Sequence, residues 1–465
     1  MNRIRSGHLV LTVRGGVGGR SVPAYLDLLA GAARPADRFD LPSVDRVLSR
    51  YGGGSRLSAV YHARRSLGRF GSHSANYDEV EEQLGISRTY KAQIARPERT
   101  HDVVEALRDL DIVESAGAQQ LATIPFEALP ATRIAAAQPA QHDIAWTPHR
   151  RVHAPEAHDL EPGDERVTTA IVDTGVIVGH PELQRKCLAG YDTCDLGMGA
   201  VNEDLRLLGD SRGFDYNPHD EVGHGSHVAG IIGAQGWRIP PGVGGRSLLL
   251  PIRVLAAAVK KNANKRIGVG ALDNINAGLK ICIDLGADVI NMSFGTPASS
   301  IDDKATLPHA RMMKYATHYG CILVAAIGNS GMEEKFYPAA HPEVIAVGSV
   351  DAQGRRSRFS TWGEHIALCA PGENIVSSGL RQYVTNSGTS FAAPFVTGAI
   401  ALLIARARQT GLKLTGPQVR TLLTESAEPL GGRFNKETGH GLLDVAAAIR
   451  LLDTRLAQRR EGGST

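Results

Sequence analysis

The stretch Gly388-Thr389-Ser390-Phe391-Ala392-Ala393-Pro394, followed by the apolar run 395–404, decides how this chain folds. The run is apolar nearly all round, which predicts a helix buried on every side. Pro394 fits such a helix only in its first turn, where no backbone N–H is missed. Ser390 is therefore expected at the helix N-terminus, where free N–H groups favour developing negative charge. A serine at this position is also a common helix cap, so a role as nucleophile requires a base and an acid elsewhere.

Length and composition limit the function classes. The chain has 465 residues, 42% hydrophobic and 21% charged, which predicts a soluble globular protein of more than one domain. A net charge of +3 is too small to indicate nucleic acid or a membrane surface as partner. We expect no membrane span and no Sec signal peptide, because the apolar runs are too short. A cytoplasmic location is the default expectation, and secretion by another route is the alternative.

The five cysteines are odd in number and scattered along the chain. No pair has zinc-finger spacing, and the set is no disulfide framework. Free thiols are the expectation for all five, including Cys187 and Cys194, which lie close enough in sequence for a disulfide to be the alternative.

Residues 1–125 alternate short strand and helix patterns in the order β-α-β, β-α-β, which predicts a small ferredoxin-like α+β domain. Residues 126–145 are rich in Ala, Pro and Gln with little periodicity, and we interpret them as a linker open to proteolysis. The polar tail 453–465 is expected to be disordered.

Residues 146–452 have an α/β pattern. Apolar strand candidates alternate with helical segments, which predicts a doubly wound parallel sheet with helices on both faces. Ligands of such sheets bind outside the carboxyl ends of the strands. The expected strands are 167–172, 248–255, 289–294, 322–327 and 344–350, and the helices between them include 227–235, 271–285 and 309–318.

Two further motifs supply partners for Ser390. Val172-Asp173-Thr174-Gly175 places an acid at the end of a buried strand, and Gly223-His224-Gly225-Ser226-His227 places a histidine at the start of a Gly-rich helix. Each has an ordinary structural interpretation, as a turn cap or a buried core histidine. Their chain order, Asp173 then His224 then Ser390, is one of the known orders of a catalytic triad.

With these three motifs the chain resembles the subtilisin-like serine protease family (subtilases, peptidase S8). The resemblance implies that Ser390 attacks the scissile carbonyl, His224 transfers the proton, and Asp173 orients the imidazole. It also implies that the Asn329 amide and the Ser390 N–H form the oxyanion hole, and that catalysis needs no cofactor. The likeness covers roughly residues 145–452 and includes 154–157, 288–295, 324–331, 337–339, 370–372 and 439–445.

Substrate is expected to bind as an added β-strand. The resemblance implies two edges for it, Gly268-Val269-Gly270 and Ser293-Phe294-Gly295. The S1 walls would be the second edge and Ala326-Ile327-Gly328. We see no acid in these segments, so we expect an apolar or broad P1 preference rather than a basic one.

The chain departs from the family pattern between Asp173 and His224, which lie 224 − 173 = 51 positions apart. The excess is acidic, and we interpret it as a solvated loop. A structural calcium site is the alternative. Glu182 stands where some family members have a calcium ligand, but the loop 236–244 does not match, so we assign no metal ligand. A basic insert, 260–266, precedes the first substrate edge and is also interpreted as solvated.

The resemblance implies that the N-terminal region is a prodomain that assists folding and then inhibits. We therefore expect a zymogen that processes itself between about residues 123 and 145, with protein or peptide substrates and its own prodomain as partners. Two alternatives stay open: an inactive pseudoprotease that serves as a binding scaffold, and a peptide ligase or macrocyclase on the same fold.

Overall fold

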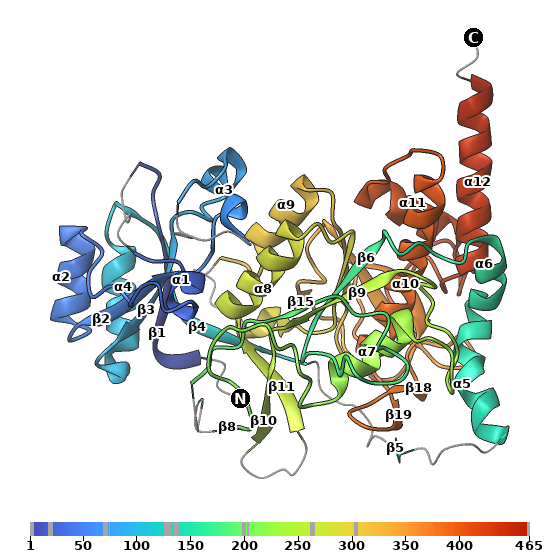
Figure 1. The fold of residues 1–465 in the computed structure, drawn as a ribbon, viewed down its shortest axis with the longest axis horizontal. Coiled ribbons are helices and arrows are strands. Elements are labelled where there is room, and N and C mark those ends of the chain that lie inside the picture. Colours follow the sequence, from blue (N-terminus) through green and yellow to red (C-terminus); the bar gives the residue numbers. More distant parts are fainter. Residues whose placement is uncertain are drawn as a thin grey trace.

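The computed structural model describes residues 4–16, 22–67, 73, 75–124, 132–133, 139–197, 201, 204–260, 266–301 and 306–462. Figure 1 shows a smaller N-terminal region, coloured blue, beside a larger region that carries the rest of the chain. The name "N-terminal region" stands below for the described residues between 4 and 124. The expected linker 126–145 and the expected processing segment lie largely outside the described residues, as does most of the basic insert 260–266.

The N-terminal region has the ferredoxin-like fold that its pattern predicts. Four strands run in the spatial order β2-β3-β1-β4, and every neighbouring pair is antiparallel. Helices α2 (Pro42–Arg50) and α4 (Thr100–Arg108) place their apolar sides against the buried side chains of β1. The strands are β1 (Ile4–Val13), β2 (Ser55–Ala59), β3 (Thr89–Ile94) and β4 (Val113–Thr123), with short helices α1 (Tyr25–Leu29) and α3 (Glu79–Gln83).

A seven-stranded parallel sheet forms the centre of the larger region, in the order β17-β16-β14-β12-β6-β9-β7. Its inner strands are buried on both faces, as near-continuous runs of Val, Ile, Leu and Ala require. The sheet confirms the predicted doubly wound α/β fold. Its strands are β6 (Thr168–Asp173), β7 (Tyr191–Asp192), β9 (Leu248–Arg253), β12 (Val289–Met292), β14 (Ile322–Ala326), β16 (Val344–Val350) and β17 (Ile366–Pro371).

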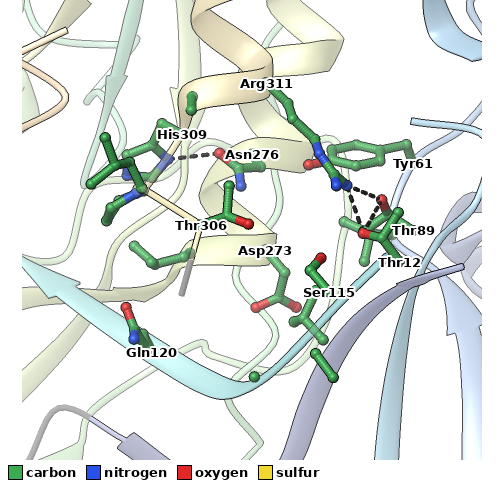
Figure 2. A pocket seen from close by; sticks show the side chains of 18 of the residues that line it. Thr12, Tyr61, Thr89, Ser115, Gln120, Asp273, Asn276, Thr306, His309 and Arg311 are labelled. Carbon is green, nitrogen blue, oxygen red and sulfur yellow. Dashed lines mark hydrogen bonds between the residues drawn. The ribbon is translucent and has the colours of Figure 1, made fainter. Parts of the chain in front are cut away.

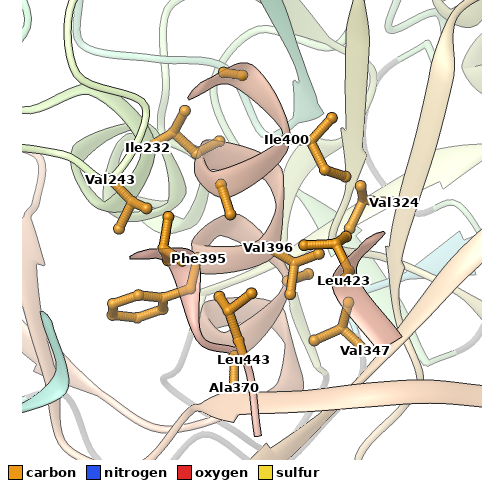
Figure 3. Packing of buried hydrophobic residues seen from close by; sticks show 14 of the residues in the cluster. Ile232, Val243, Val324, Val347, Ala370, Phe395, Val396, Ile400, Leu423 and Leu443 are labelled. Carbon is orange, nitrogen blue, oxygen red and sulfur yellow. The ribbon is translucent and has the colours of Figure 1, made fainter. Parts of the chain in front are cut away.

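Helices cover both faces of this sheet. On one face, α7 (His224–Gly233) and α10 (Thr389–Arg408) pack against each other, and α10 also contacts α12 (Val445–Gly462). On the other face, α8 (Leu272–Asp284) and α9 (Ala310–His318) form a separate core. Figure 3 shows the first core: Ile232, Val324, Val347 and Leu443 surround α10. Although α10 is long and apolar enough to cross a membrane, it is buried along nearly its whole length inside the protein.

Smaller antiparallel elements complete the fold. Strand β11 (Arg266–Ala271) of the larger region pairs with β4 of the N-terminal sheet. Strands β11, β10 (Ala256–Lys260) and β8 (Leu205–Leu207) thereby extend that sheet into the larger region. The remaining elements are β5 (Thr132–Arg133), β13 (Thr296–Pro297), β15 (Phe336–Tyr337), β18 (Ile375–Ser378), β19 (Tyr383–Asn386), α5 (Pro139–Arg151), α6 (Ala154–Leu160), α11 (Gly416–Ser426) and α12 (Val445–Gly462), with one-turn helices at Arg64–Ser66, Pro97–Arg99 and Ala298–Ser300.

Two expectations about polar segments were wrong. The tail from Asp453 is not irregular but continues α12 to Gly462, and Asp453 itself forms an ion pair with Arg406 at 2.8 Å. Part of the expected linker is also ordered, because α5 begins at Pro139. Composition suggested flexible chain in both places, whereas contacts with distant elements hold these residues in helices.

Candidate active site

Three separate elements bring the predicted acid, base and nucleophile to one end of the sheet. Asp173 is the last residue of β6, His224 is the first of α7, and Ser390 lies in the first turn of α10. His224 Nδ1 and Asp173 Oδ1 are 2.7 Å apart, and the Asp173 side chain is fully buried. Asp173 Oδ1 also accepts the Thr174 N–H at 2.7 Å, so this oxygen has two partners.

The start of α7 explains why the base meets the acid. Gly223 precedes the helix with φ 94°, a left-handed conformation that favours glycine. A side chain at Gly225 would collide with the Gly175 carbonyl oxygen. The Gly-rich sequence therefore lets the first turn of α7 pack directly on the turn that follows β6, with His224 beside Asp173.

Ser390 and His224 share a neighbour in Phe391. The Phe391 ring lies 5.3 Å from the His224 ring and 4.4 Å from the His227 ring, measured between centroids. Ser390 Oγ donates to the Ser293 carbonyl oxygen at 3.2 Å, and within the described part of the chain His224 Nε2 has no hydrogen-bond partner. The serine hydroxyl is therefore not hydrogen-bonded to His224 in this structure.

The second histidine of the motif has a packing role. His227 is fully buried, and burial lowers its pKa to about 3, so the ring is neutral. Its Nδ1 lies 3.2 Å from Asn386 Nδ2, and its ring contacts Phe391. His227 therefore contributes packing contacts beside the site.

Asn329, the predicted oxyanion donor, is anchored to the start of α10. Its Oδ1 accepts both the N–H and the hydroxyl of Thr389, each at 2.9 Å. This orients the amide so that Nδ2 lies on the Gly388 side, where a Cβ on Gly388 would be 3.3 Å from it. The amide nitrogen therefore lies close to the start of α10, where Ser390 stands.

The two predicted substrate edges hold the end of the N-terminal region between them. On the first edge, Val269 pairs with Thr123 and Gly270 with Ala122, and the Ile124 N–H donates to Gly268 O at 3.3 Å. On the second edge, the Gly295 N–H donates to Thr123 O at 3.2 Å. Residues 121–124 thus lie as an added strand between both edges, as a bound peptide would.

The predicted S1 wall segments contact the start of α10 through backbone groups, and their larger side chains point into the cores. The side chains of Phe294, Ala326 and Ile327 are buried in the two cores. The Ser293 carbonyl contacts Ser390, and the Gly328 N–H lies 3.3 Å from Thr389 Oγ1. Both segments therefore adjoin the nucleophile, and the P1 preference stays a prediction.

The acidic loop contains ion pairs and capped turns. Asp192 pairs with the buried Arg253, which also contacts Glu221 at 2.9 Å. Glu182 accepts the N–H groups of Gly236, Trp237 and Arg238 at 2.8–3.0 Å and the Tyr383 hydroxyl at 2.9 Å. Within the described ranges, no three His, Cys, Asp or Glu side chains gather as metal ligands would. Three backbone N–H groups and one hydroxyl therefore satisfy the Glu182 carboxylate.

Sequence reasoning missed the charged contact between the N-terminal region and helices α8 and α9, which we call the docking contact. Lys280 is fully buried and forms ion pairs at 2.6 Å with Asp284 of its own helix and with Glu81 of the N-terminal region. His62 lies 2.9 Å from Asp284, and burial together with the Lys280 ammonium lowers the His62 pKa. Lys280 and Glu81 are about 200 positions apart in the sequence, as are His62 and Asp284, so no local pattern could have indicated these two pairs.

A cavity of about 150 Å³, lined by both polar and apolar side chains, lies at the same docking contact. Figure 2 shows Arg311 of α9 reaching across to the hydroxyls of Thr12 and Thr89, at 2.6 and 2.7 Å. Asp273 faces the cavity and accepts the Gln119 amide at 2.8 Å. The docking contact is therefore polar as well as charged.

Comparisons with known proteins agree with this arrangement. Residues 164–441 match the model of the Subtilase family. The chain is similar to a thermophilic serine proteinase of Bacillus sp. (strain AK1), at 33% identity over 62% of this chain and 66% of that protein, just under two thirds of its length. It is also similar to subtilisin DY of Bacillus licheniformis (36% identity; 55% of this chain, 89% of the relative) and to subtilisin BL of Lederbergia lenta (33%; 64% and 97%).

Proposed function

The chain belongs to the subtilase family of serine proteases, and we propose that it is a serine endopeptidase that is made as a self-processing zymogen. The observation that carries the proposal is the convergence of Asp173, His224 and Ser390, with the Asp173–His224 contact of 2.7 Å, beside the two predicted substrate edges, with which residues 121–124 pair.

In the acylation step, the Ser390 hydroxyl turns from Ser293 O to His224 Nε2 and loses its proton to that nitrogen. Oγ attacks the scissile carbonyl carbon, and the negative charge develops on the carbonyl oxygen. The Asp173 carboxylate accepts from Nδ1–H and stabilises the imidazolium. His224 then gives its proton to the leaving amine, and an acyl-enzyme on Ser390 remains.

The oxyanion is stabilised by donors that are already in place. Asn329 Nδ2 and the Ser390 N–H, at the positive end of α10, serve as these donors. Water then attacks the acyl-enzyme, with His224 again acting as base, and the acid product leaves. Because the Asn329 amide is fixed by Thr389, it needs little reorganisation when the charge appears.

Residues 121–124 support the zymogen part of the proposal. They occupy both substrate edges, so the N-terminal region blocks other peptides while it stays in place. The chain that follows Ile124 is then the first peptide to meet Ser390. We propose that one of the bonds between about 123 and 145 is cleaved by the enzyme itself.

Hydrolysis of a peptide substrate tests the enzymatic proposal. Purified protein should release two fragments whose masses sum to the substrate plus one water, and Ser390→Ala should release none. Joined or cyclised products would indicate a ligase, and no reaction from the wild type would indicate a pseudoprotease.

Mass spectrometry of the protein itself tests self-processing. After long incubation the wild type should yield a shorter species whose new N-terminus lies between residues 123 and 145, while Ser390→Ala stays intact. Equal intact masses for both proteins would show that self-processing is wrong.

A further inference from the structure

We propose that Asp220 is a positioning residue that holds Asp173 and His224 in their catalytic arrangement. The inference rests on the proteolytic function proposed above. Asp220 lies four residues before His224, in the loop that leads into α7, and its side chain is fully buried. A buried carboxylate is costly unless its oxygens are well satisfied, so its contacts indicate what it does.

Five donors converge on the Asp220 carboxylate. Oδ1 accepts the Thr174 hydroxyl at 2.9 Å and the N–H groups of Val222 and Gly223 at 2.9 and 2.8 Å. Oδ2 accepts the N–H and the hydroxyl of Ser226 at 2.9 and 2.8 Å. Three of these donors are backbone N–H groups, which can only donate, so both oxygens must act as acceptors. An amide in place of the carboxylate would offer one acceptor oxygen instead of two.

Two of the donors link the segments that carry the acid and the base. The Thr174 hydroxyl, next to Asp173, also accepts the Gly225 N–H of α7 at 2.9 Å. The Ser226 hydroxyl of α7 also accepts the Ile177 N–H of the turn after β6 at 3.0 Å. One carboxylate therefore ties the turn that carries Asp173 to the first turn of the helix that carries His224.

The start of α7 depends on this carboxylate because the helix has no cap of its own. Gly223 stands at the N-cap position and has no side chain. The N–H groups of the second and third helical residues, Gly225 and Ser226, are satisfied by Thr174 and Asp220 instead. Loss of the Asp220 acceptors would free the first turn to move, and His224 would move with it. A displacement of about 1 Å at a reacting group can cost ~100-fold in rate.

The variant Asp220→Asn tests the proposal. It is expressed as the full-length chain, allowed to process itself, and assayed with a chromogenic peptide p-nitroanilide. We expect kcat to fall by about 10- to 100-fold and KM to change little, because the substrate edges are untouched. Active-site titration with a fluorophosphonate normalises kcat to folded, competent enzyme. Thermal unfolding measures the loss of stability separately.

Glu182→Gln is the matched control. Glu182 is also a fully buried carboxylate with three backbone N–H donors and one hydroxyl donor, but its donors come from the loop 236–238 and from Tyr383 rather than from the segments of the triad. Glu182→Gln should lower the unfolding temperature by about as much as Asp220→Asn does, and it should leave kcat within about twofold of wild type.

Equal kcat losses in both variants, or an unchanged kcat in Asp220→Asn, would overturn the proposal. If Asp220→Asn does not fold, Thr174→Val decides: it removes the hydroxyl link alone and should still lower kcat with KM unchanged, whereas wild-type kcat would overturn the proposal. A wild type that cleaves no p-nitroanilide would instead contradict the proteolytic function itself.

Discussion

The charged groups of the proposed catalytic centre lie within one region of the molecule, whereas those of the docking contact come from two regions. At the catalytic centre, acid and base lie on neighbouring segments of one region, and the rest of the site consists of backbone groups, hydroxyls and one amide. At the docking contact, the buried Lys280 has one carboxylate partner on its own helix and the other, Glu81, on the N-terminal region. The first arrangement is complete within one region, whereas the second requires both.

This difference has a physical consequence. Breaking one partner of a buried pair leaves an uncompensated charge, which costs far more than losing a surface pair. Release of the N-terminal region removes Glu81 from Lys280. It should leave the geometry of Asp173, His224 and Ser390 unchanged, because all three lie in the larger region. The two sites should therefore respond separately to mutation, and the predictions below test that separation in order of decreasing effect.

The largest effect is expected for His224→Ala. Without the base, kcat should fall by about 10⁶-fold, the loss seen on removing the corresponding histidine of subtilisin. The docking contact should be unchanged, so the N-terminal region should keep the hydrogen-exchange protection of its β4 amides. Loss of that protection in His224→Ala would show that the two sites are not separate.

Lys280→Glu should weaken the docking contact by about 3–5 kcal/mol, because Glu81 and Asp284 then face a third buried carboxylate. Made in the Ser390→Ala chain, which stays uncut, it should raise the hydrogen-exchange rate of the β4 amides. The charge swap Glu81→Lys with Lys280→Glu should restore part of the protection. Lys436→Glu, at an exposed ion pair, is the control and should change nothing at β4. Equal exchange in all variants would mean that Lys280 does not hold the N-terminal region.

Asn329→Ala should lower kcat by about 10²- to 10³-fold, or about 2.7–4 kcal/mol, the loss seen on removing the corresponding amide donor of subtilisin. KM for a short peptide should change little, since the amide acts on the charge that develops in the transition state. Steady-state kinetics separates the two parameters. A rise in KM with unchanged kcat would place Asn329 in substrate binding instead.

The smallest effect is expected for Arg311→Ala. Arg311 is partly exposed and donates to Thr12, Thr89 and Glu114 across the docking contact. Its loss should weaken that contact by about 1–2 kcal/mol, less than Lys280→Glu, and leave kcat of the processed enzyme unchanged. Exchange at β4 equal to that of Lys280→Glu would contradict the ranking.

The same contrast explains what the sequence could predict. Asp173, His224, Ser390 and Asn329 each stand in a short motif, so local pattern and family resemblance indicated where they would lie, and their roles stay a proposal. The parallel sheet followed from its apolar strands for the same reason. Strands β17 and β7 at the two edges of the sheet were not among the expected strands, and the two residues of β7 carry no periodicity.

Contacts between distant segments could not be predicted. The pairing of Lys280 with Glu81, and the contact of the Thr174 hydroxyl with Asp220, depend on folded neighbours rather than on spacing. The helical tail after Asp453 was missed because its ion pair with Arg406 lies 47 positions away. Glu182 was noted as a candidate calcium position, but its backbone partners at 236–238 were not evident from the sequence.

Mapping the adduct of a fluorophosphonate probe tests the central claim most directly. The reagent phosphonylates a serine that an adjacent base activates, so tandem mass spectrometry of the digested wild type should place a single adduct on Ser390. His224→Ala should abolish the labelling while the protein stays folded. An adduct on another serine, such as Ser293 or Ser387, or no adduct on the processed wild type, would contradict the account.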